Sequence, residues 1–156
     1  MKKDLRKTFA LGAALFALTL TTGAAAPSND AAPKQTKITV YKDPSCGCCK
    51  NWVEYLRKHG YAVDTKDTPA MAEVKRTLGV PDAVKACHTA VVNGYLIEGH
   101  VPAADIARLV REKPKVAGLA VPGMPMGSPG MEGPQKQHYQ VLSFDKNGKT
   151  KIFASY

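Results

Sequence analysis

Apolar and polar residues alternate in short, regular blocks along the chain from residue 37 onward. Blocks rich in β-branched residues with a period of two predict strands, and apolar residues three or four positions apart predict helices. These patterns predict strands at 37–42 and 61–67, a β-hairpin at 89–99, and helices at 49–60, 69–79 and 102–113. Asn93-Gly94 joins the two apolar runs of the hairpin, and this dipeptide is a strong signal for a tight turn. The predicted order is therefore β-α-β-α-β-β-α, an α/β fold.

The C-terminal part of the chain is patterned differently. Residues 114–134 are dense in glycine, proline and methionine and lack a helical or strand period, which predicts a loop. Residues 138–156 contain two strand-like runs around Asn147-Gly148, which predicts a second β-hairpin. We expect this hairpin either to extend the sheet or to pack beside it.

The N-terminal residues have the layout of a secretory signal peptide. Basic residues precede the apolar run Phe9–Leu20, and small residues follow up to a preferred cleavage site after Ala25. The apolar run is too short to cross a bilayer, which disfavours the alternative of an N-terminal membrane helix. We therefore expect a signal peptide at 1–25, a disordered leader at 26–36, and one periplasmic domain at 37–156 without a membrane span.

The charge of the chain is basic but scattered. Removing residues 1–25 takes away four basic residues and one acidic residue, which lowers the net charge from +9 to +6. The remaining lysines are spread along the whole domain, and aromatic residues do not alternate with a basic cluster. Nucleic-acid binding normally needs a concentrated basic patch, so we interpret the excess charge as solvated surface and expect no nucleic-acid partner.

The stretch DPSCGCCKNW, residues 43–52, holds three of the four cysteines of the chain. Cys46, Cys48 and Cys49 follow the first predicted strand and open the first predicted helix. That is the place of the C-x-x-C motif in the thioredoxin and glutaredoxin arrangement, so the sequence predicts a thioredoxin-like α/β sandwich with an added loop and C-terminal hairpin. In an exported protein the cysteines could also be structural disulfides. However, a bridge between adjacent cysteines is strained and a Cys46–Cys49 bridge closes only a tiny loop, which favours a chemical role.

The predicted topology brings further candidate ligands to the same end of the sheet. The third strand is antiparallel to the first and begins where the first one ends, and Cys87 and His88 immediately precede it. The fourth strand returns to this end, and His100 follows it. The loop after the third helix is long enough to bring Met124 and Met126 back to the cysteines, because nine extended residues span about 30 Å.

Together these residues form a soft donor set. Thiolate and thioether sulfur atoms favour Cu(I), and by the same reasoning Ag(I), over hard cations. Placement at a helix N-terminus lowers the pKa of a thiol, which favours both metal binding and disulfide exchange. Thiolates can bridge metal ions, so a tight cysteine cluster could hold more than one copper. Zinc is the competing metal, but structural zinc sites usually use well-separated cysteine pairs and do not use methionine.

Several of these residues also have a structural interpretation. Met124 and Met126 could fill gaps between the loop and the core. His88 could be a capping or turn residue, and His100 could cap the third helix. Cys87 is the candidate outside the cysteine motif that we favour most.

Three segments of the chain resemble one known family. They are YKDPSCGCCKNW, CHTAVVNGYLIEGHVPAADI and GLAVPGMPMGSPGME, and the resemblance covers residues 37–156. The chain resembles the periplasmic copper-resistance CopG family, also described as a metal-binding domain of unknown function. The resemblance implies a thioredoxin-like fold, Cu(I) bound by cysteines, a role in copper or silver resistance, and copper binding coupled to redox change. The positions that match the family motifs are Cys46, Cys48, Cys49, Cys87, His88, His100, Met124 and Met126.

The chain departs from ordinary thioredoxins and glutaredoxins in one respect. Their cis-proline before the third strand is absent, and His88-Thr89-Ala90 occupies that region. That proline helps to exclude metals, so its absence and the additional Cys48 favour a copper site over an exchange enzyme. We therefore expect an exported Cu(I)-binding protein whose partners are copper ions and other periplasmic copper-handling proteins. The alternative is a thiol-disulfide oxidoreductase with Cys46 as nucleophile and Cys49 as resolving thiol.

Overall fold

Up to residue 112, strands and α-helices follow one another in the order that the hydrophobic pattern predicts. The computed structural model describes residues 36–156, so the expected signal peptide at 1–25 and nearly all of the expected leader at 26–36 lie outside the described residues. The elements up to residue 112 are β1 (Lys37–Lys42), α1 (Gly47–Lys58), β2 (Ala62–Asp67), α2 (Met71–Leu78), the 3₁₀ turn η1 (Asp82–Val84), β3 (Thr89–Val92), β4 (Tyr95–Gly99) and α3 (Ala103–Glu112). Three strands follow: β5 (Gly118–Val121), β6 (Gln140–Phe144) and β7 (Thr150–Ser155).

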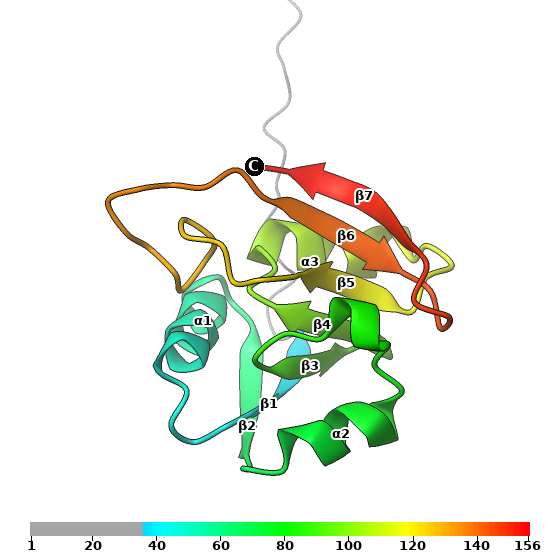
Figure 1. Ribbon diagram of the computed structural model, residues 1–156, viewed down its shortest axis with the longest axis horizontal. Coiled ribbons are helices and arrows are strands. Elements are labelled where there is room, and N and C mark those ends of the chain that lie inside the picture. The colour runs from blue at the N-terminus through cyan, green and yellow to red at the C-terminus, as the bar shows by residue number, and fades with distance from the viewer. Residues whose placement is uncertain (1–35) are drawn as a thin grey trace, which may run out of the picture.

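One mixed sheet contains the seven strands of the described residues, in the order β2-β1-β3-β4-β5-β6-β7 (Figure 1). β1 pairs in parallel with β2 and antiparallel with β3, and β3 and β4 form the predicted hairpin. The turn residues Asn93 and Gly94 have φ angles of 46° and 83°, the left-handed conformation that an Asn-Gly turn provides. The end of β1 and the beginning of β3 therefore meet at one end of the sheet.

The segment at 114–134 is not a loop throughout, which corrects the prediction from the sequence. Gly118–Val121 form β5, which pairs in parallel with β4 and antiparallel with β6. All four residues of β5 are buried, so the strand is a short apolar run without the alternation that marks a half-exposed strand. A side chain at Gly118 would lie 1.8 Å from the carbonyl oxygen of Leu96, so glycine is needed for this close pairing. Because β6 pairs with β5, the C-terminal hairpin extends the central sheet.

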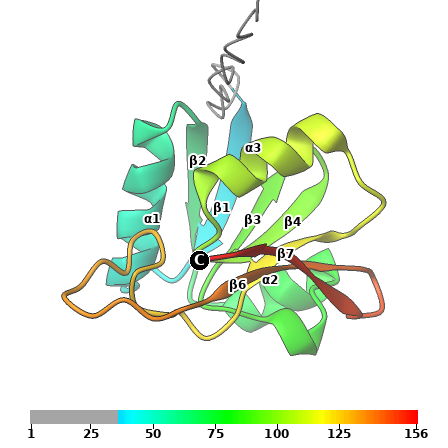
Figure 2. The same ribbon diagram turned by 90° about the horizontal axis from the view of Figure 1, so that it is seen from above.

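The three α-helices of the described residues cover both faces of the sheet. Trp52 and Leu56 of α1 and Ile106 and Leu109 of α3 share the larger hydrophobic cluster with one face. Leu78 of α2 packs against a smaller cluster on the other face, so α1 and α3 lie on one side and α2 on the other (Figure 2). No helix within residues 36–156 is both long and apolar enough to cross a membrane.

Candidate metal centre

A tight turn and the first turn of α1 shape the cysteine motif. The Asp43 carboxylate accepts the N–H of Ser45 at 2.8 Å, and the Asp43 carbonyl accepts the N–H of Cys46 at 3.1 Å. Cys46 is the N-cap of α1, and its Sγ accepts the N–H of Cys49 at 3.3 Å. The helix therefore begins at Gly47, two residues earlier than the sequence pattern predicts, and its positive dipole end lies at the cysteines.

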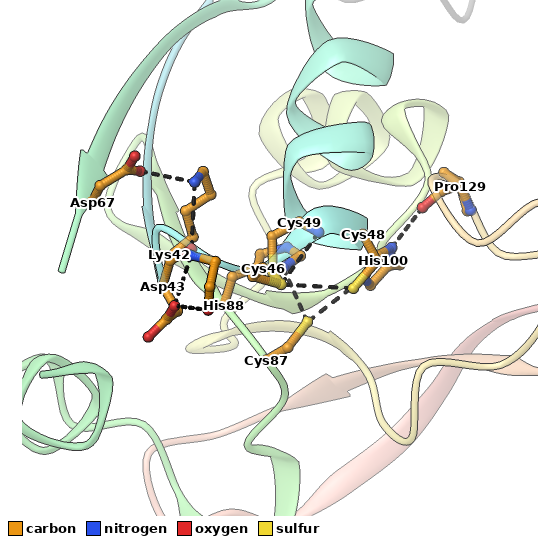
Figure 3. The surroundings of a disulfide bond; sticks show 11 residues. Lys42, Asp43, Cys46, Cys48, Cys49, Asp67, Cys87, His88, His100 and Pro129 are labelled. Atoms are coloured by element: carbon orange, nitrogen blue, oxygen red, sulfur yellow. Dashed lines mark hydrogen bonds and ion pairs between the residues drawn. A yellow bond between two sulfur atoms is a disulfide. The ribbon is translucent and has the colours of Figure 1, made fainter. Parts of the chain in front are cut away.

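Cys46, Cys48 and Cys49 form what we call the helix side of the site. Cys46 and Cys49 are joined in a disulfide with their Cα atoms 5.3 Å apart (Figure 3). Cys48 is a free thiol whose Sγ lies 3.6 Å from that of Cys46. Cys49 is buried, whereas Cys46 and Cys48 are partly exposed. Since Cys48 and Cys87 are both free, the interpretation of the four cysteines as two structural disulfides is wrong.

Cys87, His88 and His100 form what we call the sheet side of the site. The Cys87 Sγ lies 3.3 Å from Nδ1 of His88 and 3.6 Å from Nε2 of His100. Ligand atoms of these three residues all lie within 4.8 Å of one another, and so do the four cysteine sulfurs. Cys87 belongs to both groups, so it joins the helix side to the sheet side. The pairing of β3 with β1 and β4 brings these residues to the start of α1.

Hydrogen bonding fixes the ring of His100. Its Nδ1 lies 2.7 Å from the carbonyl oxygen of Pro129, and a carbonyl oxygen can only accept, so Nδ1 carries the proton. Burial lowers the pKa of His100, so the ring is neutral at pH 7 and the lone pair of Nε2 faces Cys87. Metal-binding histidines commonly donate their other ring N–H to a backbone carbonyl in this way.

His88 is completely buried against the core. Its ring centroid lies 4.4 Å from that of Trp52 and 5.2 Å from that of His100. Burial holds the pKa of His88 well below its usual range, and repulsion from the protonated form of His100 and from the Lys75 ammonium lowers it further. Its Nε2 has no hydrogen-bond partner among the described residues. His88 is therefore a neutral imidazole, the protonation state in which histidine binds metals.

The thiol of Cys87 is harder to ionise than an ordinary cysteine. Burial raises its pKa to about 12, and the neighbouring Cys48 adds to this effect. Cys87 precedes β3 and does not open a helix, so the lowering expected for thiols at a helix N-terminus does not apply to it, and the raised pKa reflects desolvation of the thiolate. A metal ion that binds Cys87 must displace its proton, so binding at the sheet side releases a proton.

The loop after β5 returns to the site through Pro129 and Gly130. Pro129 accepts the hydrogen bond from His100 described above. Gly130 packs so closely against α1 that a Cβ there would lie 2.7 Å from the backbone nitrogen of Trp52 and 3.2 Å from the carbonyl oxygen of Cys48. Its φ of 81° also favours glycine. The loop therefore covers the start of α1 at these two residues.

Met124 and Met126 lie in the same loop. The backbone of Met126 exchanges hydrogen bonds with Gln137, and its Cε lies within 2.4 Å of the position that a Cβ of Gly133 would occupy. The side chain of Met124 is 38% exposed. Within this loop Met126 thus contacts Gly133 and Gln137, Pro129 contacts His100, and Gly130 packs against α1.

A buried ion pair that the sequence pattern does not predict lies beneath the sheet side. Lys75 Nζ donates to Glu98 Oε2 and to Thr89 Oγ1, in both cases at 2.8 Å. Glu98 is fully buried, and its Oε2 also accepts the N–H of Ala86 at 2.8 Å. Burial raises the pKa of Glu98, and the adjacent ammonium of Lys75 opposes this shift. The available sequence signal is Glu98 itself, the acidic residue in an otherwise apolar hairpin.

The chain is similar to proteins of known structure. A protein-family model described as "Protein of unknown function, DUF411" matches residues 84–131, which include the sheet side and the methionine loop. Two solved structures, titled "Copper resistance protein copG- Form 1" and "Copper resistance protein copG- Form 2", each share 46% sequence identity with the chain at a TM-score of 0.72. Each match covers 77% of this chain and 96% or 97% of the matched one. A search of curated proteins gives no significant match.

Proposed function

The chain belongs to the CopG copper resistance family, and we propose on this premise that it binds Cu(I), or by the same chemistry Ag(I), through cysteine thiolates. A copper-handling role is supported by the two copper resistance structures and by a cysteine cluster that could hold a metal. The proposal adds the oxidation state of the ion, the ligands and a coupled redox step.

One observation carries the proposal: the four cysteine sulfurs lie within 4.8 Å of one another. Reduced cysteines at this spacing can share metal ions, so more than one copper per chain is expected. His88 and His100 add neutral imidazole nitrogens beside Cys87. A cluster dominated by thiolates favours Cu(I), because a soft ligand stabilises the softer ion.

Full use of the four sulfurs requires reduction of the Cys46–Cys49 disulfide. An external dithiol can reduce this disulfide through a mixed disulfide, and it supplies two electrons and two protons. The Cys46–Cys49 bond then becomes two thiols, and the external dithiol becomes a disulfide. Cu(I) then displaces the protons of the thiols that bind it. The helix side would therefore change its redox state with copper loading, while the sheet side keeps the same ligands throughout.

Three further assignments complete the proposal. The domain at 37–156 is thioredoxin-like, which is supported by the strand order β2-β1-β3-β4 and by the disulfide at the start of α1. Residues 1–25 are a signal peptide that directs the chain to the periplasm, where other copper-handling proteins are its partners. Met124 and Met126 are additional donors, which is supported by the return of their loop to α1 at Gly130.

A Cu(I) titration against a competing chelator tests this proposal. The mature protein is kept reduced and free of oxygen, and we expect at least one tightly bound copper equivalent. The variant Cys48→Ser/Cys87→Ser should lose tight binding because each substitution removes a sulfur from a different side. Ser143→Ala is the control, since this hydroxyl bonds the Lys151 carbonyl on the far strands of the sheet. Binding of less than one equivalent, or equal affinity in the double variant, contradicts the proposal.

The disulfide itself favours a second candidate function, thiol-disulfide exchange. Cys46 is partly exposed at the helix start and Cys49 is buried, which suits a nucleophile and a resolving thiol respectively. Metal-free protein should then reduce a disulfide substrate or oxidise a dithiol substrate, and Cys46→Ser should abolish this activity while Cys48→Ser retains it. A metal-free protein without exchange activity would reject this candidate and leave copper binding as the function.

A further inference from the structure

Lys75, Glu98 and Thr89 form a buried polar group directly behind the sheet side of the site. Thr89 and Glu98 face each other in the register of β3 and β4, and Lys75 reaches both from α2. The Lys75 ammonium donates to both partners, and the Thr89 hydroxyl donates to Oε1 of Glu98. All three side chains are buried. These bonds fix the orientation of the Glu98 carboxylate.

The Glu98 carboxylate holds the segment that carries Cys87. Its Oε2 accepts the N–H of Ala86 at 2.8 Å, one residue before Cys87. The N–H of the following Gly99 donates to the carbonyl oxygen of His88 at 3.4 Å, one residue after Cys87. Residues 85–88 lie outside any helix or strand, so the position of the Cys87 sulfur depends on contacts of this kind.

A buried ion pair is a costly way to stabilise a core. Desolvation of the two charges offsets much of their attraction, and apolar residues of similar size often stabilise a fold equally well. Here the ammonium of Lys75 counteracts the effect of burial on Glu98, and the carboxylate bonds a backbone N–H that no strand partner satisfies. The arrangement is therefore better explained by what it positions than by what it adds to stability.

We propose that Glu98, held by Lys75 and Thr89, is a positioning residue of the copper site. It fixes the peptide at Ala86 so that the Cys87 sulfur faces the helix-side cysteines. Glu98 is not itself a ligand, because Oε2 is bonded by Lys75 and Ala86 and Oε1 by Thr89. This inference rests on the proposed binding of Cu(I) by Cys87, and Glu98 acts only through that residue.

A double-mutant cycle between Glu98 and Cys87 tests the proposal. Cu(I) affinity is measured by chelator competition for the wild type, Glu98→Gln, Cys87→Ser and the combined variant. Supporting residues of a metal ligand typically contribute a factor of 10–100 to affinity, so we expect Glu98→Gln to weaken binding by at least about tenfold. In the Cys87→Ser background the same substitution should change affinity by less than about twofold, because Glu98 acts only through the Cys87 segment that it holds at Ala86, and residues joined in one network couple in such cycles.

Asp105→Asn is the matched control. Asp105 is also a buried carboxylate, and its partners include Arg108 on α3 and Tyr156 after β7. Asp105→Asn should lose the same charge as Glu98→Gln and a comparable amount of stability. Its Cu(I) affinity should stay within about twofold of the wild type, because independent sites do not couple. A similar loss of affinity in this control would mean that general destabilisation explains the result, and it would overturn the proposal.

Two further measurements keep the test decisive. If Glu98→Gln does not fold, Thr89→Val removes one hydrogen bond to the carboxylate and should weaken Cu(I) binding by about fivefold. In metal-free protein, hydrogen exchange at the Ala86 amide should be faster in Glu98→Gln than in the wild type. A wild type that binds no Cu(I) would overturn the proposed function and this inference together. A wild type that binds Cu(I) and a Glu98→Gln variant of equal affinity would overturn the inference alone.

Discussion

The two sides of the site are built in different ways. The helix side places three cysteines within one helical turn, and its contacts join residues that are close in the sequence. The sheet side takes Cys87 and His88 from the segment before β3 and His100 from the position after β4, and holds them against the core and the buried Glu98. A redox change on the helix side alters bonds within one turn, whereas the sheet side has no disulfide to change. This comparison suggests a changeable half and a fixed half of one site.

The largest difference between the two sides is expected for stability. Glu98→Leu leaves the Lys75 ammonium buried without its carboxylate, which should lower the free energy of unfolding by about 3–5 kcal/mol. Ser45→Ala removes an exposed hydroxyl one residue before the helix side and should change the free energy of unfolding by no more than about 0.5 kcal/mol. Urea unfolding of the metal-free proteins measures both. Equal losses would show that the two sides are held with equal strength.

The loop that spans both sides should be the next most sensitive feature. Gly130→Ala combines a positive φ with a Cβ 2.7 Å from the backbone of Trp52. We therefore expect it to lower the free energy of unfolding by about 3 kcal/mol. Gly123→Ala is the control, because its φ of 77° is similar but no atom lies within 4 Å of the new Cβ. In this control the free energy of unfolding should fall by only about 1 kcal/mol. Thermal or urea unfolding that shows no difference between the variants would mean that the close contact with α1 is unimportant.

The sheet side should also make the protein sensitive to acid. The pKa of His88 in the folded protein is well below 6.5, so below that pH the unfolded chain binds a proton that the folded chain excludes. This stabilising contribution is therefore complete above pH 6.5 and falls by about 1.4 kcal/mol per pH unit as the pH drops further. Urea unfolding on either side of pH 6.5 measures the slope. His88→Phe should reduce this slope, and an unchanged slope in that variant would contradict the role of His88.

The smallest effect is expected at the helix cap. Under reducing conditions Cys46→Ala removes the acceptor for the N–H of Cys49 and should cost about 1 kcal/mol. Cys46→Ser replaces the sulfur with a preferred N-cap oxygen and should leave the free energy of unfolding unchanged within about 0.5 kcal/mol. Urea unfolding with excess reductant compares the two variants. A loss in Cys46→Ser as large as in Cys46→Ala would mean that the sulfur does more than cap the helix.

Features that depend on local sequence could be predicted. The element order up to α3 follows from hydrophobic periodicity, and the turn at Asn93-Gly94 follows from backbone preference. Antiparallel pairing of β1 with β3 then accounts for the proximity of Cys87 to the cysteine motif. β5 could not be predicted because a four-residue strand buried on both faces carries no period.

Features that depend on tertiary contacts across the sheet could not be predicted. The sequence pattern predicts that Lys75 is a surface lysine of an amphipathic helix. Only the packing of α2 against the sheet brings its ammonium to Glu98. The length of the loop after β5 predicts that it can return, but not which residues make contact. Those residues are Pro129 and Gly130, and their role follows from a hydrogen bond and a close approach that composition does not reveal.

We propose that copper is bound between the helix side and the sheet side. X-ray absorption at the copper edge, on the reduced protein loaded with Cu(I), tests it most directly. We predict a ligand shell dominated by sulfur, and we predict that the number of sulfur neighbours falls in Cys48→Ser and in Cys87→Ser alike. A shell dominated by nitrogen or oxygen, or one that Cys87→Ser leaves unchanged, would contradict the account.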